Sequence, residues 1–192
     1  MKTILIAFTL LSALTTWASP VDKASGGTPI CYGREYSEQH MASHPNQTVK
    51  SMKVKFYVYA DFPEVTLLDI DLLIKKADKD NNVGYKPYTS GMVCDTRIDD
   101  PDEKKALTKE GLLTKNTDYI QCYIECDGGR ATVLWDITDK TESSVTFVNR
   151  GFIAYGGCGE EVEEQDSIWL APLKGGDDTF KLKALPTEYC QQ

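Results

Sequence analysis

Histidine is scarce in this sequence of 192 residues, which contains only His40 and His44. A Ser-His-Asp triad would therefore depend on one of two residues in a short N-terminal segment. The G-x-S-x-G elbow of many hydrolases is absent, and so are the glycine motifs that bind phosphates or dinucleotides. Nucleophilic catalysis and nucleotide chemistry consequently have little support in the sequence.

Basic residues are also fewer than acidic ones. The chain has 21 Lys and Arg residues against 29 Asp and Glu residues, which gives a net charge of −8 at pH 7. Because contact with a nucleic-acid backbone requires clustered positive charge, this composition argues against broad nucleic-acid binding. It favours a basic partner instead, such as a basic protein.

Long apolar runs are absent beyond the first 18 residues. Residues 4–14 are uncharged and mostly apolar, Lys2 precedes them, and Thr16 and Ala18 place small residues at the −3 and −1 positions of a cleavage site. This pattern predicts a signal peptide over residues 1–18, because a membrane-spanning helix would need about 20 apolar residues. We expect a secreted or periplasmic mature chain that starts at Ser19 and has no integral membrane segment.

All six cysteines follow the predicted signal peptide. An even number of cysteines in an exported chain predicts disulfide bonds. The C-x3-C spacing of Cys122 and Cys126 also lies within the range of zinc sites, but no second close pair accompanies it. The cysteines are Cys31, Cys94, Cys122, Cys126, Cys158 and Cys190.

Strand geometry restricts how these cysteines pair, although the sequence alone does not choose among all connectivities. Cys122 and Cys126 lie on one face of a predicted strand, and four strand residues span about 13 Å, so the two need different partners. Cys31 and Cys190 lie at the two ends of the folded region, and domain ends often lie close together. We predict the bridges Cys31–Cys190, Cys94–Cys122 and Cys126–Cys158.

Alternation of apolar and polar residues dominates the chain from residue 51 onward. Met52, Val54 and Phe56 alternate with lysines and a tyrosine, which indicates a half-buried strand. We expect an all-β fold, an antiparallel β-sandwich or small β-barrel of seven to nine strands that is stabilised by disulfides. Further strands are expected at 65–75, 83–93, 119–126, 130–137, 145–155, 167–171 and 179–184.

Three segments depart from the strand pattern. Ser37 is a candidate N-cap and Pro45 a candidate stop for a short helix of one or two turns. Residues 99–113 are expected to form a loop with at most one helical turn. Residues 19–30 are expected to be a flexible lead-in to a single β-domain over residues 31–192.

Short motifs in two parts of the chain give a resemblance. The segment 31–36 (CYGREY), His40 and the segment 44–49 (HPNQTV) resemble the opening of a group of uncharacterised secreted or periplasmic proteins of Gram-negative bacteria. The segment 122–129 (CYIECDGG) is similar to theirs as well. The resemblance implies an exported or periplasmic β-domain. It implies no activity and no functional residues, because none is assigned to that group.

His40 and His44 form a candidate metal site. On a helix, residues spaced i, i+4 lie on one face about 6 Å apart, within reach of one ion. Two nitrogens alone make a weak site, so a third ligand would have to come from elsewhere, with Glu35 or Glu38 as candidates. The alternative is an exposed polar helix, or His44 packed against the first strand.

An acidic run near the C-terminus is the candidate binding site. Five carboxylates within seven residues repel one another, so they require calcium, a basic partner surface, or water and salt around them. The alternative is a solvated loop, since charge runs usually lie exposed. The five residues are Glu160, Glu161, Glu163, Glu164 and Asp166.

Three hypotheses for function follow from these patterns. The first is an exported, acidic β-domain that binds another molecule without catalysis, for example a basic protein such as a wall hydrolase. The second is a small hydrolase that uses carboxylates, or a metal held by His40 and His44. The third is a structural component of the envelope. The sequence predicts no cofactor for the first or third hypothesis.

Overall fold

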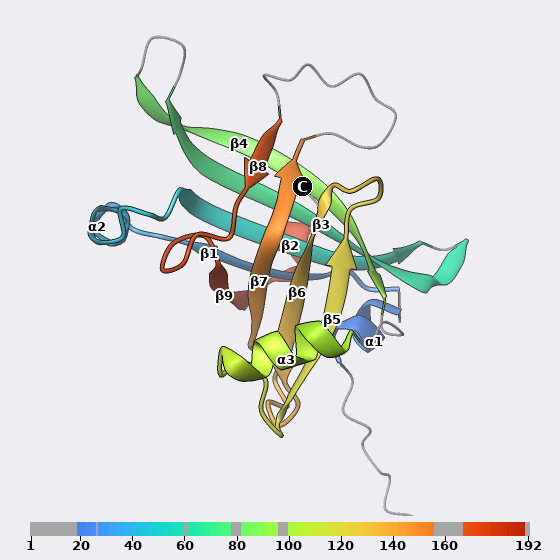
Figure 1. Ribbon diagram of the computed structural model, residues 1–192. Helices are drawn as coiled ribbons and strands as arrows, with labels where there is room; N and C mark the ends of the chain where they lie inside the picture. Colours follow the sequence, from blue (N-terminus) through green and yellow to red (C-terminus); the bar gives the residue numbers. More distant parts are fainter. Residues whose placement is uncertain are drawn as a thin grey trace, which may run out of the picture.

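The computed structural model describes residues 19–25, 27–59, 61–77, 82–95, 100–155 and 167–190, and these residues are mostly β-strand (Figure 1). The strands are β1 (Ile30–Glu35), β2 (Val49–Tyr59), β3 (Phe62–Ala77), β4 (Val83–Asp95), β5 (Thr117–Tyr123), β6 (Gly129–Asp136), β7 (Ser144–Ala154), β8 (Ile168–Leu170) and β9 (Thr179–Leu185). The helices are α1 (Pro20–Ser25), α2 (Glu38–Ser43), α3 (Pro101–Lys109) and the 3₁₀ helix η2 (Thr187–Cys190).

The strands form a closed, eight-stranded antiparallel barrel. They follow the order β6-β5-β4-β3-β2-β1-β9-β7-β8, and an additional pairing of β6 with β7 closes the ring. β8 is the ninth strand and lies outside the ring, paired only with the end of β7 among the described strands. The expected all-β fold is therefore confirmed, and of the two architectures considered it is the barrel.

Large side chains fill the inside of the barrel. In Figure 1, β5, β6 and β7 cross steeply in front of β1 to β4, and the core lies between these two walls. Alternate residues of each strand point into it, as the period of two predicts. Eight strands enclose a space just wide enough for side chains to fill. The largest fully buried side chains on the strands are Tyr32, Phe56, Phe147, Phe152, Phe180, Met52, Leu68, Ile70, Ile74, Met92 and Ile120.

The outer face of β2 and β3 carries cross-strand ion pairs. Lys53 Nζ lies 3.3 Å from Asp71 Oδ2, and Lys55 Nζ lies 3.2 Å from Asp69 Oδ2. Each lysine is directly opposite its aspartate in the strand register. Exposed pairs of this kind each contribute less than about 1 kcal/mol, so they favour the register more than they stabilise the fold.

The expected flexible lead-in of residues 19–30 contains structure instead. Residues 20–25 form α1, whose Val21 and Ala24 are only 6% and 1% exposed. The helix packs against β1, β2 and β3. Strand β1 then begins at Ile30, although no strand was expected there, because Gly33 and the charged pair after it obscure the alternation.

Residues 99–113 also differ from the expectation of a loop with one helical turn. α3 spans nine residues, and the carboxylate of Asp100 caps it by accepting hydrogen bonds from the backbone N–H groups of Asp102 and Glu103. Pro101 occupies the first helical turn, where its missing N–H costs nothing. Within the described residues, no helix has both the length and the apolar character needed to span a membrane.

Strand β5 is shorter than the expected strand at 119–126. It ends at Tyr123, and Cys126 and Asp127 adopt positive φ angles of 58° and 61° in the turn that leads to β6. The hairpin predicted from the residues 127–129 is therefore present, but it begins earlier than expected. Ile137, the last residue of the strand expected at 130–137, lies beyond β6 and is 42% exposed.

Candidate functional site

One predicted disulfide lies inside the barrel. Cys94 and Cys122 are directly opposite each other on β4 and β5, and they are bonded as predicted. Cys31 and Cys126 are disulfide-bonded as well. Their predicted partners are Cys190, whose side chain is outside the described part, and Cys158, which is not among the described residues. Those two pairings stay predictions.

The two histidines lie close together, but their rings face each other. Ser37 caps α2 as predicted, accepting a hydrogen bond from the His40 N–H. The rings of His40 and His44 stack with centroids 4.0 Å apart and planes 14° from parallel. His40 Nε2 lies 3.0 Å from Gln47 Oε1, and His44 Nδ1 lies 2.9 Å from the His40 carbonyl oxygen.

This stacking does not favour the candidate metal site. Imidazole lone pairs lie in the plane of the ring, so the nitrogens of stacked rings do not converge on one ion. Among the described residues, no group of three or more His, Cys, Asp and Glu side chains is arranged to hold a metal. Metal binding by His40 and His44 stays a prediction. Neither Glu35 nor Glu38 joins the two histidines in a group that could hold a metal.

The acidic run lies outside the described residues. Glu160, Glu161, Glu163, Glu164 and Asp166 all fall within the undescribed segment 156–166. The interaction with a basic protein that these carboxylates suggest therefore stays a prediction.

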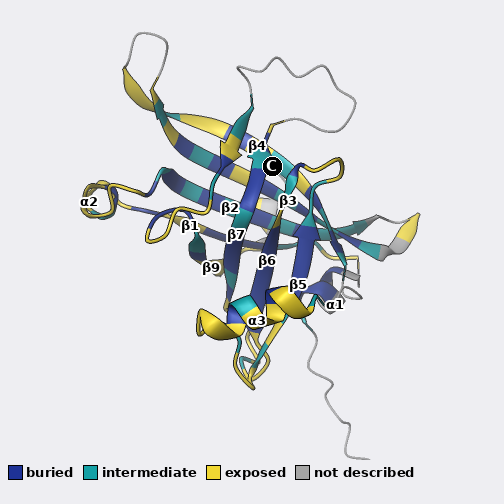
Figure 2. Cartoon of the chain, viewed as in Figure 1, coloured by how far each residue is buried: buried dark blue, intermediate teal, exposed yellow. Residues whose placement is uncertain are grey.

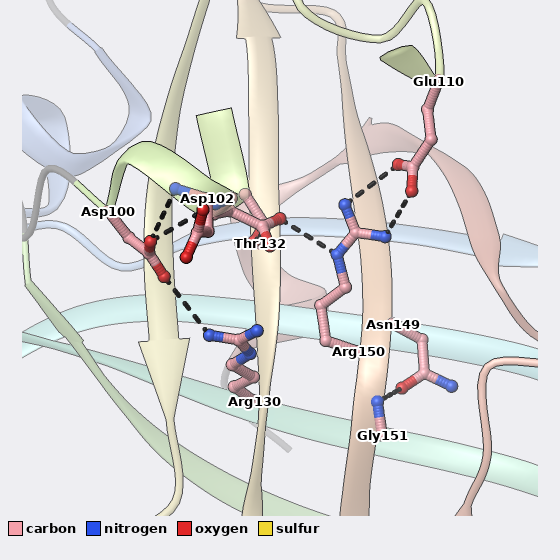
Figure 3. Close-up of polar contacts among 9 residues, drawn as sticks. Asp100, Asp102, Glu110, Arg130, Thr132, Asn149, Arg150 and Gly151 are labelled. Atoms are coloured by element: carbon pink, nitrogen blue, oxygen red, sulfur yellow. Dashed lines mark hydrogen bonds and ion pairs between the residues drawn. The ribbon is translucent and has the colours of Figure 1, made fainter. Parts of the chain in front are cut away.

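A polar cluster among the described residues holds α3 against the barrel. Arg150 on β7 donates two hydrogen bonds of 2.9 Å to the Glu110 carboxylate and one of 2.9 Å to Glu103 Oε1 (Figure 3). Thr132 on β6 donates a further hydrogen bond of 2.8 Å to the same Glu103 oxygen. Burial lowers the pKa of Arg150, but the hydrogen bonds to Glu110 and Glu103 outweigh it and raise that pKa overall.

A second ion pair secures the start of α3. Asp100 Oδ2 lies 3.4 Å from the Arg130 guanidinium (Figure 3). Hydrogen bonds from the backbone N–H groups of Glu103 and Asp102 lower the pKa of Asp100, and Arg130 contributes to the same direction. Beneath the helix, Leu107 packs against Leu134 and Val148. The helix exposes its opposite side to solvent (Figure 2). These polar groups bind one another, so the cluster has a structural role: it attaches α3 to the barrel.

Among the described residues, a groove of about 980 Å³ lies on the outer face of the barrel, across β9, β1, β2 and β3. This is the side of the sheet that faces away from β5, β6 and β7 (Figure 1). The groove exists because two outward positions have little or no side chain, namely Gly33 on β1 and Ser51 on β2. Leu185 leans over the glycine, since a Cβ added to Gly33 would lie 2.8 Å from Leu185 Cδ1.

Apolar groups form the two ends of the groove. Leu73 and Pro87 are directly opposite each other on β3 and β4, in the same cross-strand row as Ser51. At the other end lie Leu185 on β9 and Tyr189 on η2, and Tyr189 is 49% exposed. η2 packs against β1, so the C-terminal helix forms a wall of the groove.

The charge of the groove is opposite to that of the chain. Four basic and two acidic side chains line it, a net charge of +2, whereas the whole chain carries −8. Lys53 is paired with Asp71. Lys181 and Lys183 lie two residues apart on the exposed side of β9, and neither has an ion-pair partner among the described residues. Glu35 contributes an acidic side chain to the same lining from β1, the strand paired with β9.

Comparison with other proteins adds no assignment. No known protein family, curated protein or solved structure matches this chain. The resemblance to secreted proteins of Gram-negative bacteria accordingly stays a prediction, and the site is judged from its own geometry.

The sequence analysis did not identify the groove. Its lining comes from six strands and a C-terminal helix, so it depends on the register of strands far apart in the chain. One signal was present: a glycine within a strand often marks a close approach of another group, and Gly33 is such a position. In the sequence, the alternation of Lys181 and Lys183 with Phe180 and Leu182 indicates only the outer face of a strand.

Proposed function

We propose that this protein is an exported, disulfide-stabilised binding protein whose ligand occupies the outer groove across β9, β1, β2 and β3. The observation that carries the proposal is that, among the described residues, large side chains occupy the barrel interior while an open, largely apolar groove lies on the outside. Ligand sites in proteins are typically concave, apolar and equipped with a few polar groups. The groove has this character, and its volume falls at the upper end of that range, which extends to about 1,000 Å³.

Two arguments favour binding over the hydrolase hypothesis. A general acid–base pair needs two carboxylates that are free to act on one bond. Asp69 and Asp71, the paired carboxylates nearest the groove, are each engaged by a lysine on β2. Asp69 also accepts a hydrogen bond of 3.1 Å from the Tyr57 hydroxyl. The second argument is the groove itself, which offers a ligand an apolar recess with charged side chains along it.

Export is part of the proposal. It is supported by the apolar N-terminal run and by the disulfides of Cys94, Cys122, Cys31 and Cys126, since such bonds form and persist in oxidising compartments. The predicted cleavage before Ser19 leaves α1 intact in the mature chain. The intact mass of exported material tests this part: the expected mass is that of residues 19–192, and retention of residues 1–18 would contradict it.

Fragment binding followed by NMR tests the groove. Small aromatic and aliphatic fragments added to the ¹⁵N-labelled mature protein are expected to shift the amides of Gly33, Ser51 and Leu73. In Ser51→Trp, the indole fills the groove and these shifts should disappear. Lys105→Trp, at an exposed position of α3 away from the groove, is the matched control and should keep them. Fragments that leave the groove amides unmoved in the wild-type protein would overturn the proposal.

A further inference from the structure

Lys181 and Lys183 give the groove a cationic rim at one end. Successive outward residues of a strand lie about 7 Å apart, so the two ammonium groups can approach one anionic headgroup together. Charged hydrogen bonds are stronger than neutral ones, and these lysines have no carboxylate partner among the described residues. The rim therefore favours an anion at the β9 end of the groove.

The floor of the groove offers little to a peptide backbone. β1 and β2 each pair with a strand on both sides, so their backbone N–H and C=O groups are used within the sheet. A peptide lying across the floor would leave its own backbone groups unpaired, and each such group costs free energy. Hydroxyl groups are few, with those of Ser51, Ser144 and Tyr189 in the lining. A hydrocarbon chain has no polar groups that need hydrogen bonds, so the floor can accommodate it.

The length of the groove is consistent with an extended chain. From β9 to β4 it crosses four strand spacings, about 19 Å at the usual separation of strands. Leu185 and Tyr189 lie near the lysines, and Leu73 and Pro87 lie at the far end. The polar section between them contains Lys53 and Asp71, which neutralise each other, and Glu35, whose charge leaves the two lysines of β9 with a net charge of +1 at that end.

We propose that the groove binds an amphipathic anion with a single extended acyl chain, its headgroup at Lys181 and Lys183 and its hydrocarbon directed toward Leu73 and Pro87. The proposal rests on the proposed function and specifies its ligand class. Binding takes place on the outside of the barrel, and the packed interior takes no part in it.

A fluorescent fatty acid, 11-(dansylamino)undecanoate, tests the proposal with the full mature protein below the micellar concentration of each amphiphile. Dodecanoate is expected to displace this probe, whereas dodecyltrimethylammonium, which has the same chain and the opposite charge, is expected to displace it at least about tenfold less well. The double substitution Lys181→Ala/Lys183→Ala should weaken probe binding about tenfold. Lys104→Ala/Lys105→Ala, which removes two exposed lysines from α3, is the matched control and should leave it unchanged.

NMR shifts caused by dodecanoate in the wild-type protein provide a readout independent of the variants. The amides of Lys181, Lys183 and Leu73 are expected to move. Equal displacement by the two dodecyl compounds, or binding unaffected by the β9 substitutions, would overturn the acyl-anion proposal. So would stronger displacement by a peptide of alternating glutamate and leucine. If fragments map to the groove while dodecanoate does not bind, this inference fails and the proposed function stands; if fragments also fail, both are wrong.

Discussion

Arg150 attaches α3 to the barrel through two carboxylates. Its guanidinium serves two carboxylates, and one of them, Glu103, is only 3% exposed. A buried ion pair is weak support for stability as a unit, because desolvation offsets the attraction. Removing one partner is different, since it leaves the other as an uncompensated charge in a poorly solvated place.

Arg150→Met should therefore lower the free energy of unfolding by about 3 kcal/mol, although it keeps most of the side-chain volume. Glu110→Gln serves as the control, because Glu110 is 40% exposed and its loss should cost less than about 1 kcal/mol. Urea denaturation measures both. Adding Glu103→Gln to Arg150→Met should recover part of the loss; no recovery would mean that the buried charge is not the cause.

Tyr32 illustrates how the apolar core acts on a titratable group. Its ring packs edge-on against Phe56, and its hydroxyl is buried without a hydrogen-bond partner among the described residues. Burial raises the pKa of Tyr32, and the nearby carboxylates of Glu142 and Asp139 raise it further. The folded protein therefore holds this proton more tightly than the unfolded chain, in which the pKa is near 10.0.

Stability should decrease as the pH rises above about 10, because the unfolded chain then releases the Tyr32 proton and the folded chain does not. In Tyr32→Phe this dependence should become shallower, with little loss of stability at neutral pH. Urea denaturation at about pH 8 and about pH 10.5 compares the two proteins. Tyr36 and Tyr85, whose pKa values are also raised, account for a remaining slope in the variant. Identical slopes would contradict the assignment to Tyr32.

At the scale of the elements, a pair of glycines shapes the junction of β6 and β7. Gly129 and Gly151 have φ angles of 97° and 93°, in a region that disfavours side chains. A Cβ added to Gly129 would collide with the carbonyl oxygen of Gly151, and the Trp169 ring lies where a Cβ on Gly151 would be. The register between β6 and β7 shifts at this point. The two strands thus approach closely only because both residues are glycine.

Gly129→Ala should destabilise the protein more than Gly111→Ala. Both glycines have positive φ, but an added Cβ at Gly111 meets no atom within 4 Å. The cost at Gly111 is expected to be about 1–2 kcal/mol, the penalty of the left-handed conformation alone. At Gly129 the collision with backbone adds to it. Thermal and urea unfolding of the two variants give the difference, and equal losses would show that the close approach relaxes without cost.

The elements also show how far the sequence could be read. The central parts of β2 and β3 alternate regularly, so their positions and inward faces were predictable, whereas register shifts occur near both ends of β2. β1 was missed because Gly33 and two charged residues follow one another within six residues. α3 was underestimated because few of its residues are buried, although Asp100 followed by Pro101 is a helix start signal. The groove could not be predicted from the sequence, because the register across distant strands determines which outward side chains meet.

For the whole molecule, the Cys94–Cys122 bridge links the two strands on either side of the loop that carries α3. It closes a segment with a sequence separation of 28. The double variant Cys94→Ala/Cys122→Ala should lose about 3.5 kcal/mol by the loop-entropy estimate. Non-reducing peptide mapping is expected to find this bridge together with Cys31–Cys190 and Cys126–Cys158. A Cys31–Cys158 peptide would contradict the remaining pairing.

The acidic run bears on the charge of the whole molecule. If residues 160–166 form a solvated loop, Glu161→Gln/Glu163→Gln should leave the free energy of unfolding within about 0.5 kcal/mol of the wild-type value. Melting with and without calcium measures this. A larger loss, or a calcium-dependent shift in the wild-type protein alone, would assign a specific role to the run.

The closure of the barrel has a consequence for the order of folding. Of its eight interfaces in the described chain, six join consecutive strands, whereas β1–β9 joins residues as distant as Cys31 and Leu185. Local pairings form at a low entropic cost, but distant ones require a long loop to close first. A chain synthesised from its N-terminus can form the meander from β1 to β7 first. The barrel closes only after β9 has been synthesised, because β9 pairs with both β1 and β7. During that interval β1 and β7 are open edges, which are prone to pair with another chain.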